Sequence, residues 1–287
     1  MKYEFMEKER SRFAVERMCR LLGVTRSGYY AWLRERDTGR RLKENEALLE
    51  AIRRFYKASR DTYGSPRITE DLRAAGLLCG ENRIARLMRV NGIIAKTKRR
   101  FKATTNSRHR LPVSPNVLNR SFTADGPNKV WTSDITYVWT EEGWLYLAVV
   151  LDLFSRQIIG WAMGDRIDTA LVLRAFRQAV MRRRPATGLI FHSDRGSQYA
   201  SADFRKALKS CCADQSMSNK GDCYDNAVTE TFFHTLKTEL VYFERYKTRA
   251  EAKRGIFEYI EVFYNRLRRH SALGYRAPHA FEQAKVA

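Results

Sequence analysis

The sequence predicts an α/β protein in which a strongly basic helical part precedes a domain built on a mixed sheet. Apolar residues recur at helical spacing in the first 100 residues, whereas runs of strand length and composition begin near residue 130. The 287 residues carry 53 Lys and Arg against 32 Asp and Glu, a net charge of +21. At about 150 residues per domain, this length allows two domains and a smaller third.

The positive charge is concentrated in the first part of the chain. Residues 1–120 hold 29 basic and 13 acidic residues, whereas residues 121–287 hold 24 and 19. Such a basic region is expected to bind a polyanion, with nucleic acid the first candidate and an anionic membrane surface the second. The apolar content of 44% excludes a wholly disordered chain. The longest apolar run, WLYLAVVLDLF, is broken by Asp152 and is too short to cross a membrane.

Two pairs of helices are predicted in the basic part. In the first pair, the helix containing Met18 ends at Gly23 and a second helix covers residues 27–36. In the second pair, Pro66 lies in the first turn of one helix and residues 81–90 form the other. Each pair is joined by a short turn containing glycine, which favours a helix-turn-helix. An ordinary helical hairpin with a solvated basic surface is the alternative.

The helix over residues 81–90 is expected to present its basic side to DNA. Ile84, Leu87 and Met88 form its apolar stripe, so its arginines project elsewhere. The dense basic run KTKRRFK follows and is expected to clamp phosphates. The candidate DNA contacts in this part are Arg83, Arg86, Arg89, Lys96, Lys98, Arg99 and Arg100.

The C-terminal part begins with three strands that predict an antiparallel meander: VWTSDITYV, GWLYLAVVLDLF and RQIIGWAMG. A helix over residues 169–181, the short strand GLIFHSD and helices over 203–210, 227–240 and 250–268 follow. The predicted domains are a helix-turn-helix segment over residues 1–44, a second helix-turn-helix domain over 45–102, a linker over 103–128 and the sheet domain over 129–287.

Three carboxylates of the sheet domain are candidates for one site. Asp134 lies within a β-branched and aromatic strand, where an aspartate is disfavoured. Asp194 follows a buried strand, at the edge of the sheet where sites are usually built. Glu230 lies on the polar side of a helix with His234 and Lys237. Asp152 is a rival candidate, but its place before the FSR turn favours a role in stabilising that turn.

These carboxylates are chemically suited to a hard cation. Mg²⁺ prefers oxygen ligands, and two such ions can activate a nucleophile and stabilise the leaving oxygen of a phosphodiester. In a protein that binds an anionic substrate, three negative charges in one place would otherwise oppose binding. The residues taken singly also have ordinary interpretations, namely a hydrogen-bonded structural aspartate, a turn cap and a solvated glutamate.

The chain resembles the D-D-E transposases and retroviral integrases, and most closely the second open-reading-frame product of IS3-type bacterial insertion sequences. The resemblance lies in VWTSDITYV, HSDRGSQYAS, SMSNKGDCYDNAVTETFFHTLK and YIEVFYNRLRRHSALGYRAP. Asp194 and Glu230 are separated by 35 residues, the spacing of that family. The segments LLGVTRSGYYAW and YGSPRITEDLRAAG resemble its helix-turn-helix region. The similarity covers nearly the whole chain.

The resemblance implies an RNase H-like core with Asp134, Asp194 and Glu230 as catalytic ligands of two Mg²⁺ or Mn²⁺ ions. It implies a transposase that cleaves insertion-element ends and joins the freed 3′-hydroxyl to another phosphodiester. Lys237 matches a basic position near substrate DNA, with His234 a weaker candidate. The implied partners are double-stranded DNA of element ends and target, the upstream open-reading-frame product and further copies of the chain, in the bacterial cytoplasm. A DNA nuclease without strand transfer and a non-catalytic DNA-binding regulator are the alternatives.

Overall fold

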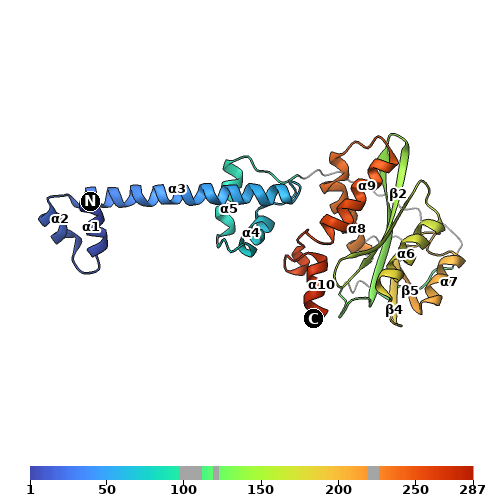
Figure 1. Cartoon of the computed structure of the whole chain (residues 1–287). Coiled ribbons are helices and arrows are strands. Elements are labelled where there is room, and N and C mark those ends of the chain that lie inside the picture. Colours follow the sequence, from blue (N-terminus) through green and yellow to red (C-terminus); the bar gives the residue numbers. More distant parts are fainter. Residues whose placement is uncertain (97–111, 119–122, 219–225, 287) are drawn as a thin grey trace. The chain divides into compact units, whose positions relative to one another are not determined.

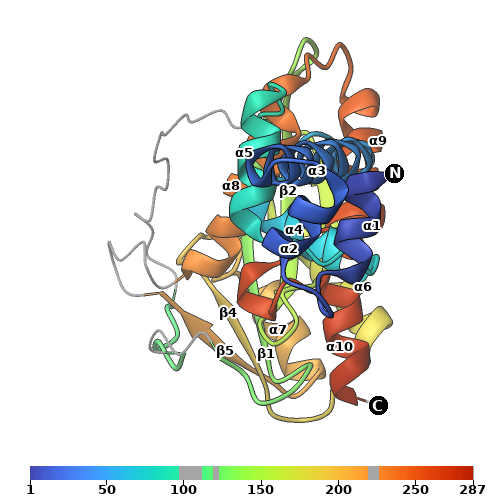
Figure 2. The same ribbon diagram turned by 90° about the vertical axis from the view of Figure 1, so that its left-hand side faces the viewer.

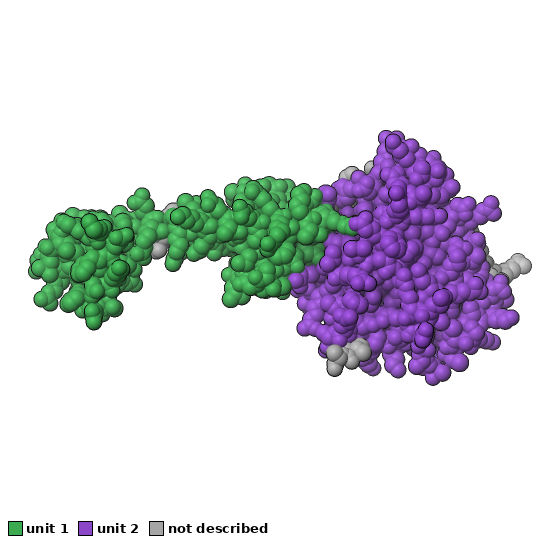
Figure 3. All heavy atoms as spheres, in the orientation of Figure 1, with its two compact units in different colours: residues 1–94 green, residues 95–287 purple. Residues whose placement is uncertain are grey.

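The computed structural model describes residues 1–96, 112–118, 123–218 and 226–286, and it divides into two compact units (Figure 3). Unit 1 comprises residues 1–94 and unit 2 comprises residues 95–287. Among the described residues, no helix combines the length and the apolar character needed to cross a membrane.

Unit 1 begins with a small three-helix cluster formed by α1 (Lys2–Glu9), α2 (Val15–Leu22) and the start of α3 (Arg26–Ala58). Met6, Met18 and Tyr29 form its buried core. Gly23 ends α2 in the left-handed conformation, at φ 63°, as the sequence predicts. Helix α1 is not evident from the sequence pattern because only one of its side chains, Met6, is buried.

The predicted end of the following helix at residue 36 is wrong. Helix α3 continues without interruption to Ala58, and so passes through residues 44 and 45, where the sequence suggested a domain boundary (Figure 1). The residues after position 36 contain no proline and are rich in Ala, Leu, Glu, Lys and Arg, which favour a helix. Gly39 within the helix costs only about 1 kcal/mol relative to Ala, which such neighbours offset.

The second predicted helix pair is confirmed as α4 (Ser65–Ala74) and α5 (Glu81–Val90). Pro66 lies in the first turn of α4, where its missing N–H leaves no helical hydrogen bond unmade. The apolar stripe of α5 is buried as predicted, with Ile84, Leu87 and Met88 each at most 9% exposed. These side chains pack in the space between α5 and the neighbouring helices α3 and α4.

Unit 2 is built on a five-stranded sheet in the order β3-β2-β1-β4-β5. Its strands are β1 (Val130–Thr140), β2 (Gly143–Asp152), β3 (Ile158–Gly164), β4 (Leu189–Ser193) and β5 (Ala213–Met217). The pairs β1–β2 and β2–β3 are antiparallel, which confirms the predicted meander. The pairs β1–β4 and β4–β5 are parallel (Figure 2). The predicted α/β class with a mixed sheet is therefore correct.

Helices cover both faces of this sheet (Figure 1). Helices α6 (Thr169–Arg183) and α7 (Ala202–Ser210) pack on one face, over a core that includes Trp131, Phe176 and Phe191. Helices α8 (Ala227–Glu239) and α9 (Arg249–Glu258) lie on the other face. A short 3-10 turn, η2 (Val241–Phe243), follows α8, and α10 (Pro278–Val286) is the last element.

Three parts of unit 2 differ from the sequence prediction or add to it. Strand β5 was not predicted, because the segment CCADQSM lacks the apolar and β-branched pattern of a strand. The predicted helix over 250–268 ends as α9 at Glu258 and continues as one π-helical segment, η3 (Tyr259–Tyr264), before 3-10 turn η4 (Ser271–Leu273). Within the predicted linker, Leu118 is buried and its N–H donates to Ser216 in β5.

Candidate functional site

The two aspartates meet where β1 and β4 stop pairing. Ser133 and Ser193 are the last residues paired between these parallel strands, so Asp134 and Asp194 are the next residues on neighbouring strands. Asp134 accepts a hydrogen bond from its neighbour's N–H, that of Ile135, at 2.7 Å. Asp194 accepts the N–H of Gly196 at 2.9 Å and so also stabilises the turn after β4. Neighbouring strands lie about 4.8 Å apart, which brings the two carboxylates together.

Helix α8 carries Glu230 and is fixed to β1 beside Asp134. The Thr229 hydroxyl donates to the Thr132 hydroxyl at 2.8 Å, and both side chains are buried. Asn226, the residue before the helix, donates its side-chain amide to the Ser133 carbonyl at 3.2 Å, and its side chain makes no capping hydrogen bond to the helix. Because Thr229 precedes Glu230, these contacts fix the start of α8 on the strand that carries Asp134.

The predicted amphipathic character of α8 is also observed. Phe232, Phe233 and Leu236 are buried beneath the helix, while Glu230 and His234 are exposed and Lys237 is partly buried. The spacing of 3.6 residues per turn places the three polar residues on one side, as the sequence predicts.

The electrostatics of the site are dominated by like charges. Burial raises the pKa of Asp134 well above its usual range, and the negative charges of Asp194 and Glu230 raise it further. The hydrogen bond from Ile135 and the Lys237 ammonium oppose this rise. Burial also raises the pKa of Glu230. Carboxylates whose charges repel one another in a partly buried site fit a cation, which would remove the repulsion.

The described residues contain no group of three His, Cys, Asp or Glu side chains close enough together to form a ready metal cluster. The structure brings Asp134 and Asp194 together and leaves Glu230 exposed on α8. The oxygen donors themselves suit Mg²⁺ or Mn²⁺, which prefer carboxylates and retain several waters. The donor chemistry of the two aspartates therefore fits a hard cation, and Glu230 is the carboxylate that α8 carries on its polar side.

Lys237 lies between the carboxylates and an aromatic ring. Its ammonium nitrogen is 4.8 Å from the centre of the Tyr137 ring, a cation–π contact. Burial lowers the pKa of Lys237, while Tyr137 and the charge of Asp134 oppose that effect. The side chain is thus held within the field of Asp134, rather than extended into solvent.

Buried polar contacts support β1 from the other face of the sheet. The Ser133 hydroxyl donates to the Val149 carbonyl at 2.7 Å and shares a hydrogen bond with the Tyr199 hydroxyl at 2.8 Å. Tyr199 is buried, and it belongs to the turn that follows Asp194. This contact links the segment after β4 to the residue beside Asp134, which holds the two aspartates in fixed relation.

Asp152 has the structural role that the sequence favoured. It is fully buried, and its carboxylate accepts the N–H groups of Asn128 at 2.8 Å and Phe154 at 2.9 Å. Its own carbonyl accepts the N–H of Arg156 at 2.8 Å, which closes the turn between β2 and β3. Asp152 is therefore part of the turn and not of the carboxylate site.

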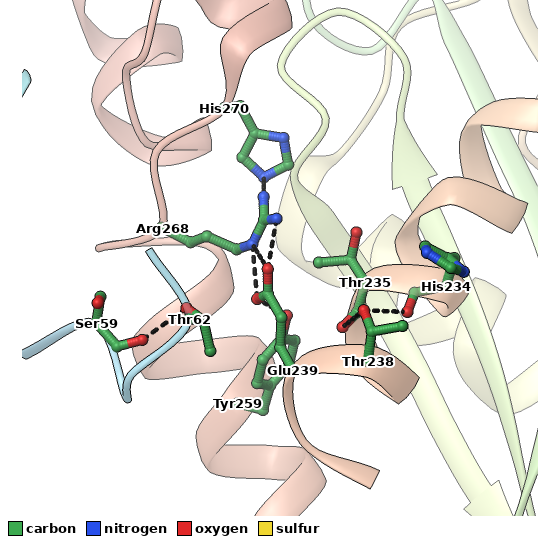
Figure 4. A network of polar contacts seen from close by, with 9 residues as sticks. All are labelled: Ser59, Thr62, His234, Thr235, Thr238, Glu239, Tyr259, Arg268 and His270. Atoms are coloured by element: carbon green, nitrogen blue, oxygen red, sulfur yellow. Dashed lines mark hydrogen bonds and ion pairs between the residues drawn. The ribbon is translucent and has the colours of Figure 1, made fainter. Parts of the chain in front are cut away.

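A buried ion pair behind α8 was not identified from the sequence (Figure 4). Arg268 donates three hydrogen bonds of 2.7–3.1 Å to the carboxylate of Glu239, the last residue of α8. The hydroxyl of Tyr259 donates to the same carboxylate at 2.7 Å, and Arg268 also contacts His270 at 3.2 Å. The pair fixes the C-terminal end of α8 to the segment after η3. Its only signal in the sequence is the polar cluster within YNRLRRH.

The candidate DNA contacts of the basic part fall into four groups. Arg86 and Arg89 are exposed on α5. Arg83 is engaged within unit 1, since it donates to Asn45 at 2.8 and 3.0 Å and contacts Glu44 at 3.3 Å, which ties α5 to α3. The ammonium of Lys96 lies 5.8 Å from the centre of the Phe243 ring. The remaining candidates, Lys98, Arg99 and Arg100, lie outside the described residues.

Comparison with protein-family models identifies both parts of the chain. Residues 124–223 and residues 230–286 match two models, each described as an integrase core domain. Residues 43–101 match a model described as an HTH-like domain. The first integrase match contains Asp134 and Asp194, and Glu230 is the first residue of the second.

Curated relatives match the chain along its length. It is 44% identical over 288 residues to Transposase InsF for insertion sequence IS3A of Escherichia coli (strain K12), with 100% of both chains covered. It is 46% identical over 266 residues to an IS600 insertion-element protein of 31 kDa from Shigella sonnei, with 93% of this chain and 97% of that protein covered.

Among solved structures, similar chains come from retroviral integrases. A chain of the simian T-cell lymphotropic virus intasome is 16% identical, with a TM-score of 0.48, and the match covers 75% of this chain and 70% of that one. The HTLV-2 integrase catalytic core domain is 17% identical, with a TM-score of 0.41, covering 51% and 92%.

Proposed function

Because the chain belongs to the IS3-type family of insertion-sequence transposases, we propose that Asp134, Asp194 and Glu230 form the centre at which it cuts and joins DNA. The observation that carries this proposal is that Asp134 and Asp194 directly follow Ser133 and Ser193, the last residues paired between the parallel strands β1 and β4. The raised pKa of Asp134 supports it, because the site is costly to charge without a counter-ion.

The proposed reaction has two steps that use the same groups. Water attacks the phosphorus at an element end, forming a P–O bond and releasing the 3′-oxygen as a hydroxyl. That hydroxyl then attacks a second phosphodiester and displaces its 3′-oxygen. Asp134, Asp194 and Glu230 would hold Mg²⁺ or Mn²⁺, two ions in all. When bound, these ions supply charge neutralisation of the phosphate and acidify the attacking oxygen.

Lys237 is proposed to bind the phosphate beside the reacting group. Its partial burial and its contact with Tyr137 restrict the ammonium, so less freedom is lost when a phosphate binds. His234, one turn before Lys237 on the exposed side of α8, is a second candidate for a backbone contact. Neither role requires a covalent intermediate with the protein.

DNA is proposed to be held by Arg86 and Arg89 of α5 and by the basic run that follows, with base reading and phosphate binding divided between them. The proposed partners further include additional copies of the chain and the upstream open-reading-frame product, since two element ends must be joined in one complex.

Three conservative variants test the carboxylate centre: Asp134→Asn, Asp194→Asn and Glu230→Gln. Each should abolish Mg²⁺-dependent cleavage of element-end DNA while leaving DNA binding largely unchanged, because each removes a ligand charge and keeps the shape of the side chain. Asp203→Asn, an exposed carboxylate on α7, is the matched control and should retain activity. Near-normal cleavage by any of the three variants would remove that residue from the centre.

The same assay separates the alternatives. Strand-transfer products on supercoiled target DNA are expected from a transposase, whereas a nuclease would stop at hydrolysis and a regulator would yield neither product. The reactions are run with and without the upstream product, so that a need for that partner is measured directly.

A further inference from the structure

The end of the β1–β2 hairpin presents exposed aromatic rings close to the carboxylate site. Trp139 and Trp144 are directly paired across the two strands, and they are 57% and 42% exposed. Their ring centres are 4.8 Å apart, and the Tyr137 ring lies 5.0 Å from that of Trp144. Both contacts are edge-to-face rather than stacked, so no ring of the cluster lies flat on another. We call Tyr137, Trp139 and Trp144 the hairpin aromatic cluster.

The cluster lies on a part of the sheet that the helices do not cover. Side chains alternate along a strand, and the alternate residues Val138, Thr140 and Leu145 are buried on the face of α8 and α9. The cluster therefore belongs to the face of α6 and α7, beyond the region that those helices cover. A cross-strand aromatic pair stabilises a hairpin by about 0.2–1 kcal/mol, but that role does not require exposed indoles.

One positive group contacts the cluster on the side of β1, and a second lies near its neighbour Tyr146 on the side of β3. On the side of β1, the ammonium of Lys237 contacts the Tyr137 ring and interacts with the charge of Asp134. On the side of β3, Gly164 is paired with Tyr146, and a Cβ on Gly164 would lie 3.2 Å from the Arg174 guanidinium.

The acidic residues of the hairpin turn do not oppose an anionic ligand strongly. Glu141 pairs with Arg245, at 3.1 Å, and Glu142 accepts the N–H of Arg249 at 2.8 Å. Aromatic faces flanked by cations match a nucleic acid strand, whose bases stack and whose phosphates are anionic. An apolar protein surface would not use the flanking charges.

We propose that the hairpin aromatic cluster binds unstacked bases of single-stranded DNA at the element end. Asp134 lies on the opposite face of the sheet, so the strand would pass around the edge of β1 beyond Ser133, where β4 no longer pairs, to the phosphodiester that Asp134 and Asp194 act on. The proposal rests on the proposed function for the location of that phosphodiester. Where the strands separate at the end of the element, stacking on Trp139 and Trp144 would offset the base stacking that is lost. Lys237 links the two sites because it contacts both the cluster and the charge of Asp134.

The test compares Trp139→Ala and Trp144→Ala in the full-length protein with Phe257→Ala. Phe257 is an aromatic residue of α9 that is 49% exposed and packs on Trp161, on the opposite face of the sheet. The probes are a fluorescein-labelled oligothymidylate of about 12 nucleotides and a blunt duplex of about 30 base pairs. Anisotropy titrations give both affinities, and circular dichroism with melting curves confirms the fold of each variant.

Each tryptophan variant should lower the affinity for the oligothymidylate about five- to 150-fold, which corresponds to about 1–3 kcal/mol for one stacked base. Duplex affinity should change less than twofold, and Phe257→Ala should alter neither. Trp139→Phe should recover most of the loss, because phenyl rings also stack. A 5-iodouracil-substituted oligonucleotide should cross-link to the tryptic peptides that contain Trp139 or Trp144.

Equal losses for single strand and duplex, unchanged affinity, or cross-links only elsewhere would overturn the proposal. Sedimentation analysis tests the alternative that a second copy of the chain binds the cluster. If Trp139→Ala dissociates an oligomer and leaves the oligonucleotide affinity intact, the cluster is a contact between copies of the chain. Asp134→Asn should bind the oligothymidylate normally, so failure of the carboxylate centre and failure of the stacking site are distinguishable.

Discussion

At the scale of single residues, Asp134 illustrates how a functional group can be recognised by its unfavourable position. An ionised aspartate is poorly placed beside Asp194 in a partly buried strand, and the hydrogen bond from Ile135 offsets only part of the penalty. Thr132 and Ser133 lie on opposite faces of the same strand, and the hydroxyl of each has a buried hydrogen-bond partner. The contrast supports the proposal that Asp134 belongs to a site that binds a cation.

The variant Asp134→Asn should therefore stabilise the protein in the absence of divalent metal, because it removes one of two adjacent like charges. A gain of about 1 kcal/mol would raise the melting temperature by about 2–4 °C for a domain of this size. Mg²⁺ should raise the melting temperature of the wild type and much less that of the variant, since a ligand stabilises the state that binds it. An undiminished Mg²⁺ effect in the variant would show that Asp134 is not a ligand.

Lys237 should matter more for joining DNA than for stability. Lys237→Ala should lower strand joining at least tenfold while the melting temperature stays within about 2 °C, since one partly exposed cation contributes about 1 kcal/mol or less. Lys237→Arg should restore activity only partly, because a planar guanidinium does not replace a compact ammonium. Lys209→Ala, an exposed lysine of α7, is the control. Joining that falls only in proportion to unfolding would leave Lys237 with a structural role.

At the scale of elements, α8 is positioned at both of its ends. Thr229 and Asn226 attach its start to β1, and Glu239 attaches its end to Arg268. Glu230 and Lys237 lie between these attachments, so their positions depend on contacts that neither residue makes itself.

Breaking the ion pair from one side should be strongly destabilising. The side chains of Arg268 and Glu239 are only 6% and 8% exposed. Arg268→Met leaves the Glu239 carboxylate buried without its ion-pair partner, and should lower the free energy of unfolding by about 3–5 kcal/mol. The double variant Arg268→Met with Glu239→Gln should recover much of that loss, because no buried charge remains. Urea denaturation measures both, and equal stability of the single and double variants would contradict the assignment.

The three-helix cluster of unit 1 contains a hydrogen bond that should make it sensitive to acid. The Tyr29 hydroxyl donates to Glu7 at 2.6 Å and lowers the pKa of that carboxyl, with smaller contributions from Arg10. Because the pKa of Glu7 is lower in the folded protein than in the unfolded chain, the ionised carboxylate stabilises the fold. This stabilisation is complete at pH values above the pKa of the unfolded chain, and it is lost as the pH falls through the pKa of the folded protein. Tyr29→Phe should raise the pKa of Glu7 and cost about 1 kcal/mol at neutral pH, and the difference should vanish in acid. NMR titration of the Glu7 carboxyl checks the shift.

At the scale of the whole molecule, charge and chemistry are divided along the chain. The first 120 residues carry a net charge of +16, whereas the carboxylate site lies in the remaining part, of net charge +5. DNA affinity and catalysis should therefore respond to different substitutions.

The double variant Arg86→Ala with Arg89→Ala should weaken binding to any duplex and reduce the slope of log affinity against log salt by about 2, since each neutralised phosphate contributes about 0.9. Lys285→Ala removes an exposed lysine of α10 and is the control. It should change the salt slope by less than the value of about 0.9 that one phosphate contact contributes. A full salt slope in the double variant would exclude these arginines as phosphate contacts.

The sequence by itself determined the α/β class, the meander, the helices α4, α5, α6 and α7 and the polar side of α8. These follow from local periodicity and from turn residues such as Gly23 and Pro66, which act within a few positions. The carboxylates could be proposed because an aspartate within a strand conflicts with local preference and because the motifs and the 35-residue spacing resemble a known family. The turn role of Asp152 could be proposed for the same local reason.

Only the tertiary structure decided the features that depend on distant residues. The length of α3, the strand β5 and the ion pair of Arg268 with Glu239 have little local signal, because packing between remote segments stabilises them. The pairing of Ser133 with Ser193, which brings Asp134 beside Asp194, joins residues 60 positions apart. Periodicity identifies which side of an element is buried, but the register between strands depends on a fold in which all of them are present.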